Sequence, residues 1–514
     1  MQETDRAEAQ ETADSLKGAE ERNKLGQFST PFLLADQMVK HALSFLDPAT
    51  PLRFLEPAVG TGVFFSALLR NVDAARIQFA TGCEIDPSYG DIAQKIWRPH
   101  GLEILSCDFI DFAADPNHFG QYSLVCTNPP YVRHHHLAPE QKLRLQSLVV
   151  QRLGLQPSGL SGLYVYFLLL ADALLPEGAV ATWLLPAEFL YVNYGQVLRD
   201  YLTSRVTLLS IHHFDPDEVQ FDDALVSSCI VTYRKARPAD DTQCEMSFGG
   251  HANEPRVRNH LSVEQLRTLN KWTPSHFGPA HESSGVRLKD LVVVRRGIAT
   301  GANDYFIIDS QTVAKYEIPC HYLKPILPGP RYLHDTVIDA APDGTPRLEG
   351  FRYLLACTAS PDEVKRKHPG LWAYFEEGIA QGLPEHHLCA HREVWYFQEK
   401  RDPAPFLASY MGRSCDARSC PIRFFANFSS ALVTNGFLNL YPTPEFSEIL
   451  GNNRTRIIEF VEVLNAIPSE AIFHAGRAYG GGLHKIEPKE LCAVPLPSLP
   501  TWLSDSLKKC SLAV

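Results

Sequence analysis

Short apolar runs alternate with amphipathic stretches between about residues 54 and 233 of the chain. The amphipathic stretches have the spacing of helices that bury one face, and three of them cover residues 63–70, 87–97 and 164–174. The apolar runs have the length of buried strands and cover residues 53–56, 77–85, 102–106, 124–127, 179–185, 208–212 and 226–233. Such alternation predicts an α/β domain whose parallel sheet is covered by helices on both faces. The last two runs are joined by a stretch without helical period, so they are candidates for an antiparallel pair.

The pattern differs on either side of this region. Residues 1–23 carry few apolar side chains, so we expect a mobile N-terminal segment there. The α/β pattern stops near Tyr233, and the polar, proline-containing residues 272–285 predict a linker. From residue 286 to residue 514 the chain is irregular and rich in aromatic residues. We therefore expect a first domain at residues 24–272 and a mixed, loop-rich second domain at residues 286–514.

Composition narrows the class of protein. The 514 residues carry a net charge of −11, which excludes a protein that coats nucleic acid through bulk positive charge. No apolar run approaches the roughly 18–20 residues of a membrane span, and the polar N-terminus lacks the apolar core of a signal peptide. We expect a cytoplasmic protein with reduced thiols. Cys389, His391, Cys415 and Cys420 suggest zinc, but CDARSC is wider than a CxxC knuckle, so we predict no metal.

The first chemical signal is the segment LEPAVGTG at residues 55–62. A strand that ends in Glu56, a turn with Gly60 and Gly62, and a following helix form the usual surroundings of a nucleotide-like cofactor. Glycines let the backbone approach a ligand, and the helix N-terminus offers free N–H groups. Phe65 stands where a third glycine would complete a dinucleotide motif, which argues against a nicotinamide cofactor.

Two acids follow at the ends of the next two strands. Glu84 in GCEIDP is placed to accept hydrogen bonds from both hydroxyls of a ribose. Asp108 in SCDFIDF is placed to receive an adenine amino group, with Phe109 beside it for apolar contact. The alternative is that these acids only cap the helices that follow them.

The fourth strand ends in Asn128-Pro129-Pro130-Tyr131. An aromatic amine is a poor nucleophile because its lone pair is delocalised into the ring. The Asn128 side-chain oxygen and the Pro129 carbonyl can each accept one N–H, which localises that lone pair on nitrogen. The two prolines stiffen the turn so that both acceptors point the same way, and Tyr131 offers a stacking face to a base.

In this order, GQFSTP (residues 26–31), LEPAVGTG, GCEIDP, CDF and NPPY resemble the gamma-class DNA adenine-N6 methyltransferases, the TaqI-like enzymes of restriction–modification systems. The resemblance covers residues 24–233 and continues more loosely through RRGIATGANDYF and GRAYGGGLHKIEP. It implies a Rossmann-like S-adenosylmethionine-dependent domain followed by a target-recognition domain. The residues that would bind S-adenosylmethionine are Thr30, Pro31, Glu56, Ala58, Gly60, Glu84, Asp108, Phe109 and Asn128.

The resemblance also implies how the target base is held. Asn128, Pro129 and Pro130 would form the catalytic turn, and Tyr131 would stack on an adenine flipped out of double-stranded DNA. A second aromatic residue is expected in the loop before the last strand, where Phe221 is the candidate, with packing on the sheet as the alternative. Arg133, Arg295 and Arg296 are weak candidates for DNA contacts. His134, His135 and His136 could also touch DNA, but a solvated loop is preferred.

The predicted function is therefore site-specific adenine-N6 methylation by a monomer, with a separate cognate restriction endonuclease as a possible partner and no membrane association. The same turn occurs in protein-glutamine and RNA guanine-N2 methyltransferases. The long second domain, basic and aromatic in places, suits DNA recognition better. Cytosine-N4 methylation and a non-catalytic DNA-binding specificity protein remain the alternatives.

Overall fold

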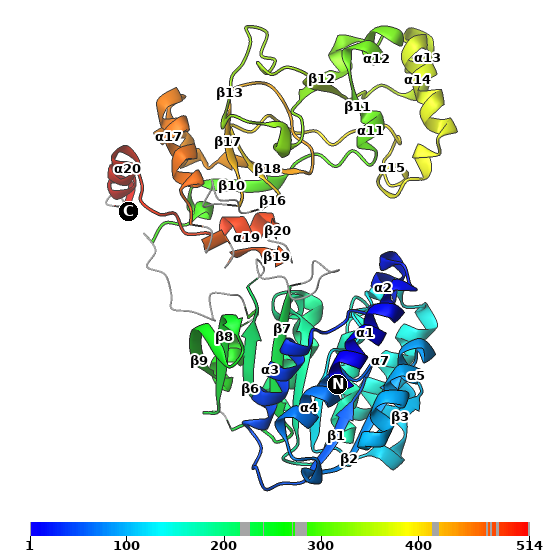
Figure 1. Ribbon diagram of the computed structural model, residues 1–514. Helices are drawn as coiled ribbons and strands as arrows, with labels where there is room; N and C mark the ends of the chain where they lie inside the picture. Colours follow the sequence, from blue (N-terminus) through cyan, green and yellow to red (C-terminus); the bar gives the residue numbers. More distant parts are fainter. Residues whose placement is uncertain are drawn as a thin grey trace. The chain divides into compact units, whose positions relative to one another are not determined.

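The computed structural model describes residues 2–215, 227–239, 241–269, 271–272, 285–413, 421–468, 471–472, 475–479 and 483–511. The chain divides into two units (Figure 1). The first is built from residues 1–280, together with residues 479–482, and the second from residues 281–478 and 483–514. The division falls among residues 273–284, which lie outside the described residues, so the boundaries expected from the sequence stay predictions.

One sheet forms the centre of the first unit, in the order β3-β2-β1-β4-β5-β7-β6-β8-β9. Its strands are β1 (Leu52–Glu56), β2 (Ile77–Glu84), β3 (Leu102–Ser106), β4 (Leu124–Thr127), β5 (Val180–Pro186), β6 (Thr207–His213), β7 (Ser228–Arg234), β8 (Gln243–His251) and β9 (Glu254–Ser262). The pairs β3–β2, β2–β1, β1–β4 and β4–β5 are parallel. The carboxyl ends of β1 to β4 therefore meet at one edge of the sheet.

The sequence prediction of this α/β sheet is confirmed, including the antiparallel pairing of the last two predicted strands, β6 and β7. The expectation that the α/β pattern ends near Tyr233 is wrong, because β8 pairs with β6 and β9 pairs with β8. β9 alternates exposed and half-buried residues, as an edge strand does. Because β9 has few apolar residues, the sequence did not predict it as a buried strand.

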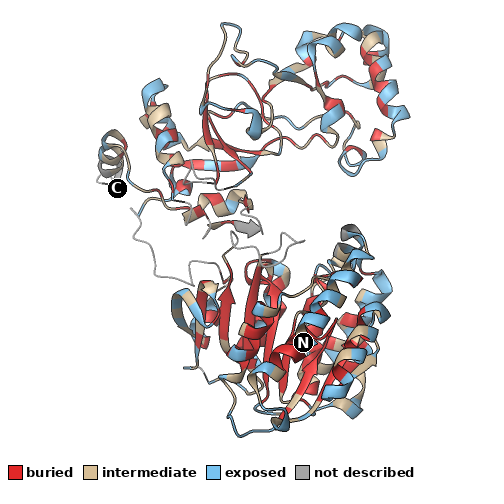
Figure 2. Cartoon of the chain, in the orientation of Figure 1, coloured by how far each residue is buried: buried red, intermediate tan, exposed pale blue. Residues whose placement is uncertain are grey.

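Helices cover both faces of the sheet. They are α1 (Gln2–Ser15), α2 (Ala19–Leu25), α3 (Phe32–Leu43), α4 (Val63–Asn71), α5 (Pro87–Trp97), α6 (Phe109–Ala114), α7 (Pro139–Leu153), α8 (Leu163–Ala171), α9 (Gln196–Ser204) and α10 (Val263–Thr268). One apolar cluster contains side chains of α3, α4 and α5, and another contains those of α6, α7, α8 and α9. Neighbouring residues on a strand enter opposite clusters, as Leu184 and Leu185 do. Figure 2 shows the sheet between them as buried.

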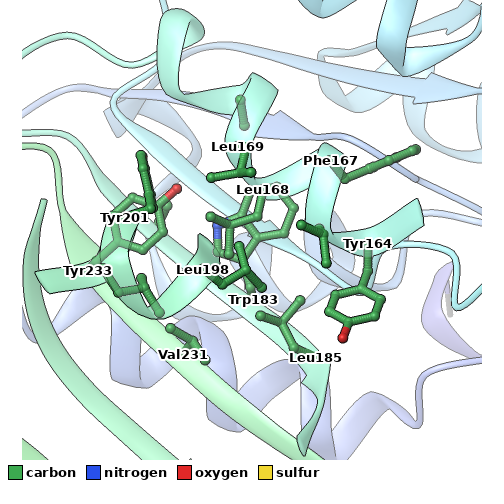
Figure 3. Packing of buried hydrophobic residues seen from close by; sticks show 14 of the residues in the cluster. Tyr164, Phe167, Leu168, Leu169, Trp183, Leu185, Leu198, Tyr201, Val231 and Tyr233 are labelled. Atoms are coloured by element: carbon green, nitrogen blue, oxygen red, sulfur yellow. The ribbon is translucent and has the colours of Figure 1, made fainter. Parts of the chain in front are cut away.

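Trp183 on β5 is fully buried in the cluster beneath α8 and α9 (Figure 3). Leu168, Leu198 and Tyr201 belong to the same cluster. Fully burying a leucine such as Leu168 or Leu198 stabilises a fold by about 1.5–3 kcal/mol. This packing fixes β5 against its helices, and β5 in turn pairs with β4, the strand that directly precedes the turn at residues 128–131.

The second unit has three smaller sheets among its described residues. Their strand orders are β10-β18-β15-β17-β13, β11-β14-β12 and β16-β20-β19. The strands are β10 (Val292–Arg296), β11 (Ile307–Ile308), β12 (Leu323–Ile326), β13 (Val337–Ile338), β14 (Arg352–Leu355), β15 (Phe406–Ser409), β16 (Met411–Arg413), β17 (Phe424–Asn427), β18 (Phe437–Pro442), β19 (Arg477–Tyr479) and β20 (Leu483–Lys485). Within the described part of this unit, the helices of at least five residues are α12 (Ser310–Lys315), α13 (Pro361–Lys367), α14 (Pro369–Ala380), α16 (Pro444–Leu450), α17 (Arg454–Asn465), α19 (Pro488–Cys492) and α20 (Thr501–Ser511). The short strands and many connections agree with the mixed, loop-rich fold expected for this half.

Within the described ranges, no helix is both long enough and apolar enough to cross a membrane.

Candidate functional site

A cavity of about 470 Å³ opens at the carboxyl edge of β1, β2, β3 and β4. Most residues predicted to bind a cofactor line it, namely Thr30, Glu56, Ala58, Gly60, Glu84, Asp108, Phe109 and Asn128. Pro130 also lines it, whereas Pro31, Pro129 and Tyr131 are not among the lining residues. Three strand ends and the NPPY turn thus contribute to one cavity.

The glycine turn between β1 and α4 forms one wall. Gly62 precedes the first residue of α4 with φ 86°, a left-handed conformation that disfavours other residues. A Cβ atom at Gly62 would also lie 2.5 Å from the indole ring of Trp97. The same indole, on α5, donates from Nε1 to the Thr61 carbonyl at 2.8 Å, and this hydrogen bond holds the turn in place. The sequence therefore needs glycine at this position for both conformation and space.

Glu84 is held at the end of β2 by backbone donors. Its Oε2 accepts from the Gly60 N–H at 2.8 Å, and its Oε1 accepts from the Asp86 N–H at 2.9 Å. Burial raises the pKa of Glu84 above its usual range, and these backbone hydrogen bonds oppose the shift. A carboxylate oxygen can accept more than one hydrogen bond, so both oxygens remain able to receive ligand hydroxyls.

Asp108 has a structural role as well as a place in the cavity. Its Oδ1 accepts from the Ile110 N–H at 2.8 Å and caps α6, which is the alternative considered from the sequence. Phe109 is buried, with its ring centroid 4.8 Å from that of Phe167. This packing gives the cavity a fixed apolar wall beside a polar acceptor.

Glu56 is the most deeply buried acid in the cavity wall, with 1% of its surface exposed. Burial raises its pKa well above the usual range, while backbone N–H groups of Phe64 and Phe65 and the charge of Arg6 act in the opposite direction. Its Oε2 accepts from the Phe65 N–H at 3.2 Å. An acid buried to this degree gains from a cationic ligand group beside it.

Asn128, the first residue of the NPPY turn, lines the cavity. Its Nδ2 donates to the Thr30 hydroxyl at 3.1 Å and to the Phe28 carbonyl at 3.3 Å. These bonds fix the amide orientation and leave Oδ1 as the free end. Oδ1 is buried and has no hydrogen-bond partner among the described residues. A buried acceptor without a partner is costly in a folded protein, and such atoms occur where a ligand completes the bonding.

Tyr131 points away from solvent, with 7% of its surface exposed. Its hydroxyl donates to the Leu184 carbonyl at 3.1 Å, and its ring centroid lies 5.6 Å from that of Phe28. Gly26 fastens the preceding loop here, since its carbonyl accepts from the Tyr131 N–H at 3.2 Å. Gly26 has φ +69°, and a Cβ atom there would lie 2.5 Å from the Tyr131 nitrogen.

The N-terminal segment, residues 1–23, was expected to be mobile and differs most from its prediction. Residues 2–15 form helix α1, and Arg6 and Gln10 of this helix line the cavity. A signal was present in the sequence, because Arg6, Gln10 and Asp14 recur at the four-residue spacing of one helix face. The repeated residues are polar, so this helix face shows no apolar periodicity.

Other candidates fall outside the cavity. His134–His136 form a single 3-10 turn with no buried residue, and Arg133 is exposed. On β10, Arg295 is exposed, whereas Arg296 pairs with Glu487 at 2.7 Å. Phe221, Cys415 and Cys420 lie outside the described residues. Within the described part of the chain, no group of three or more metal-ligating side chains is found.

Comparisons with known proteins agree with this architecture. The Eco57I restriction-modification methylase model matches residues 91–221, and the model for the C-terminal domain of Type II methyltransferase M.Eco57I matches residues 269–513. The chain is 26% identical over 490 residues to Type II methyltransferase M.AccI of Acinetobacter calcoaceticus, covering 92% of this chain and 85% of the relative. It is 24% identical to Type II methyltransferase M.XamI of Xanthomonas campestris pv. amaranthicola, covering 88% and 81%.

Among solved structures, the fold is similar to that of the type IIL restriction-modification enzyme MmeI, solved in complex with DNA. The TM-score is 0.58 at 14% identity, over 98% of this chain and 73% of that one. The type IIG restriction endonuclease BpuSI is longer, and the chain spans 60% of its length.

Proposed function

The chain belongs to the restriction–modification methyltransferase family, and from that premise we propose that it is a DNA methyltransferase that transfers the methyl group of S-adenosylmethionine to N6 of adenine in double-stranded DNA. The observation that carries the choice of an amino nitrogen is the buried Oδ1 of Asn128 at the cavity, which has no hydrogen-bond partner in the described part of the chain. An exocyclic amine offers two N–H groups. Asn128 Oδ1 accepts one of them, and the Pro129 carbonyl accepts the other.

Catalysis at such a site is positioning and electrostatics. Two fixed acceptors pull the amine towards tetrahedral geometry, so its lone pair localises and faces the sulfonium methyl group. With S-adenosylmethionine bound, the methyl group would pass from sulfur to N6 in one in-line displacement with no covalent enzyme intermediate. S-adenosylhomocysteine would be the leaving group, and the methylated nitrogen would then release one proton to solvent. Acceptors that are already in place need no reorganisation when positive charge develops on nitrogen.

We assign each part of the cofactor to residues at the cavity. Glu84 would bind the ribose hydroxyls, and Asp108 with Phe109 would bind the adenine. The methionine end would be held by Thr30, Glu56, Ala58 and Gly60, with Pro31 next to Thr30 in the chain. The buried carboxyl of Glu56 suits the methionine ammonium group, because a neighbouring cation favours the ionised form of an acid whose pKa burial has raised.

The target base comes from outside the stack, because N6 of a paired adenine is not accessible to Asn128. We assign Tyr131 to one face of the flipped base, with its ring fixed by the bond from its hydroxyl to Leu184. Phe221 is the candidate for the other face. Flipping costs a few kcal/mol, which stacking in the site and contacts along the DNA offset.

The second unit is the proposed reader of DNA sequence. The family model that matches it describes a C-terminal domain of a Type II methyltransferase. Of the three arginines suggested from the sequence, Arg133 and Arg295 are exposed, whereas Arg296 is already paired with Glu487. We therefore retain Arg133 and Arg295 as phosphate contacts. A separate restriction endonuclease and a monomeric state complete the proposal.

Single-molecule sequencing of DNA from cells that express the chain tests the proposed base and site together. We expect N6-methyladenine at one short recurring sequence, and no modification when the cells express Asn128→Ala. Methylation of cytosine N4 instead would support the cytosine alternative. Unmodified DNA together with tight, sequence-specific binding by the purified protein would support a non-catalytic specificity protein.

A further inference from the structure

Helix α1 is held at the cavity by polar contacts. Arg6 Nη1 donates to the Thr61 hydroxyl at 2.8 Å, and that hydroxyl donates to Gln10 Oε1 at 2.6 Å. One turn later, Asp14 accepts from the Ser29 hydroxyl at 2.6 Å and from the Tyr89 hydroxyl at 2.8 Å. The only buried residues of the helix are Arg6 and Ala13. The helix is thus attached by hydrogen bonds to the glycine turn and to the loop before α3.

Arg6 is a buried, charged residue of α1 that reaches the cavity. It is 5% exposed and lines the cavity. Glu3 accepts from its Nε at 2.9 and 3.0 Å and from its Nη2 at 2.6 Å. A guanidinium group has five N–H donors, and these bonds with the one to Thr61 occupy three of them. Among the described residues, one N–H on each terminal nitrogen has no partner, and such a pair of donors can bind a carboxylate in the bidentate form.

Arg6 differs in charge from the other ionisable residues that line the cavity. Of the described residues that line it, Arg6 alone carries a positive charge, whereas Glu56, Glu84, Asp86 and Asp108 are acids. S-adenosylmethionine carries a sulfonium, an ammonium group and one carboxylate. The acids suit its two cationic groups and repel its carboxylate. Arg6 contacts Thr61 of the glycine turn and acts electrostatically on Glu56, at the end of the cavity assigned to methionine.

We propose that Arg6 binds the carboxylate of the methionine moiety, so that helix α1 completes the cofactor site. The inference rests on the proposed cofactor. A charge-assisted pair of hydrogen bonds from a planar guanidinium fixes both the position and the rotation of the carboxylate. The sulfonium is joined to that carboxylate through two methylene groups and one further carbon. Fixing the carboxylate therefore limits where the reactive methyl group can lie relative to Asn128.

The competing explanation is that Arg6 only fastens the glycine turn through Thr61. The two explanations differ for a ligand that lacks the carboxylate and keeps every other group. Decarboxylated S-adenosylmethionine is that ligand. A fastening role affects both cofactors equally, whereas a carboxylate-binding role affects S-adenosylmethionine alone.

The test is calorimetric titration of the full chain with the two ligands. Because Arg6→Gln alone would leave Glu3 with an uncompensated charge, the variant is the double substitution Glu3→Gln/Arg6→Gln, which leaves the net charge unchanged. We expect the wild type to bind S-adenosylmethionine about 10- to 100-fold more tightly than its decarboxylated form, within the range of a charged hydrogen-bonded contact. The double variant should lose most of this preference and bind decarboxylated S-adenosylmethionine within about threefold of the wild type.

Two controls keep the result unambiguous. Lys24→Gln removes an exposed positive charge from the same N-terminal region and should keep the preference. Retained binding of the decarboxylated ligand shows that the double variant is folded. An unchanged preference in the double variant, or an equal loss of both ligands, would overturn the assignment of Arg6 while the proposed cofactor stands. A wild type that binds neither ligand would overturn the proposed cofactor as well.

Discussion

The two ends of the cavity differ in whether their polar groups already have hydrogen-bond partners within the protein. At the cofactor end, Glu84 already accepts two backbone hydrogen bonds and Asp108 caps a helix. At the end proposed for the target, Oδ1 of Asn128 has no partner among the described residues. Groups satisfied within the fold can bind a ligand without DNA, whereas in the proposed function the Asn128 acceptor is completed only when the target amine binds. The first end should therefore determine affinity for the cofactor, and the second should determine the rate of transfer.

The largest effect should come from removing the second unit, because this change should abolish selective DNA binding and leave cofactor binding intact. A fragment that ends before Val286 is expected to bind S-adenosylmethionine as the full chain does. It should lose its preference for the cognate duplex over other DNA, a factor of about 1,000 or more for site-specific proteins. Binding isotherms for cofactor and for cognate and scrambled duplexes are the measurement.

The salt dependence sharpens this experiment. DNA binding by the full chain should weaken steeply with salt, because phosphate contacts release counterions, and cofactor binding should hardly change. If a soluble fragment bound the cognate duplex as selectively as the full chain, the second unit would not be the reader. Recognition would then be assigned to the loop after Tyr131.

The next largest effect is expected from Asn128→Ala. Loss of one positioned polar group that acts on developing charge costs about 100- to 1,000-fold in kcat. The dissociation constant for S-adenosylmethionine should change little, because the lost acceptor faces the target amine. Single-turnover methylation at saturating cofactor and DNA measures the step itself. Transfer at the wild-type rate would remove Asn128 from the mechanism.

A smaller effect, on binding alone, is expected from Glu84→Ala. Removing an acceptor of both ribose hydroxyls should weaken S-adenosylmethionine about 10- to 100-fold, and kcat at saturating cofactor should be nearly retained. Titration with NAD provides the comparison, since the incomplete glycine motif predicts no binding of a nicotinamide cofactor. Tight NAD binding without S-adenosylmethionine binding would contradict the cofactor assignment.

The smallest effect concerns pH. Burial raises the pKa of Glu84, so its ionised, ribose-binding form is fully present above that raised pKa and is lost as the pH falls through it. Cofactor affinity should therefore decrease with falling pH, by at most about tenfold per pH unit, starting above the usual range of a glutamate. Glu84→Gln should flatten this dependence. Titrations between neutral and mildly acidic pH measure it, and an identical slope in the variant would assign the proton to another group.

The sequence was sufficient to predict the strands and the cavity residues wherever the local sequence pattern agrees with the packing. Apolar runs predicted the parallel strands because both faces of this sheet are buried. The glycine turn, Glu84 and Asp108 could be placed in one cavity because parallel strands end at the same edge. NPPY was recognisable because two prolines restrict the backbone whatever surrounds them.

The parts that the sequence did not predict lack such a pattern. Helix α1 docks through Arg6, Gln10 and Asp14, and hydrogen bonds to distant residues leave no apolar period in the chain. Strand β9 is an edge strand with alternating exposure, and its pairing with β8 is a long-range contact. The second unit divides its core among several clusters around short strands, so no single stretch carries a long period.

The contact at Gly26 couples the cofactor to the proposed target base. Because the Gly26 carbonyl accepts from the Tyr131 N–H, the loop that carries Phe28 and Thr30 is fastened to the turn assigned to the base. An opening of this loop to exchange spent cofactor for fresh would also shift Asn128 and Tyr131, so a captured base should slow that exchange. We expect S-adenosylhomocysteine to dissociate more slowly from its complex with the protein and the cognate duplex than from its complex with the protein alone.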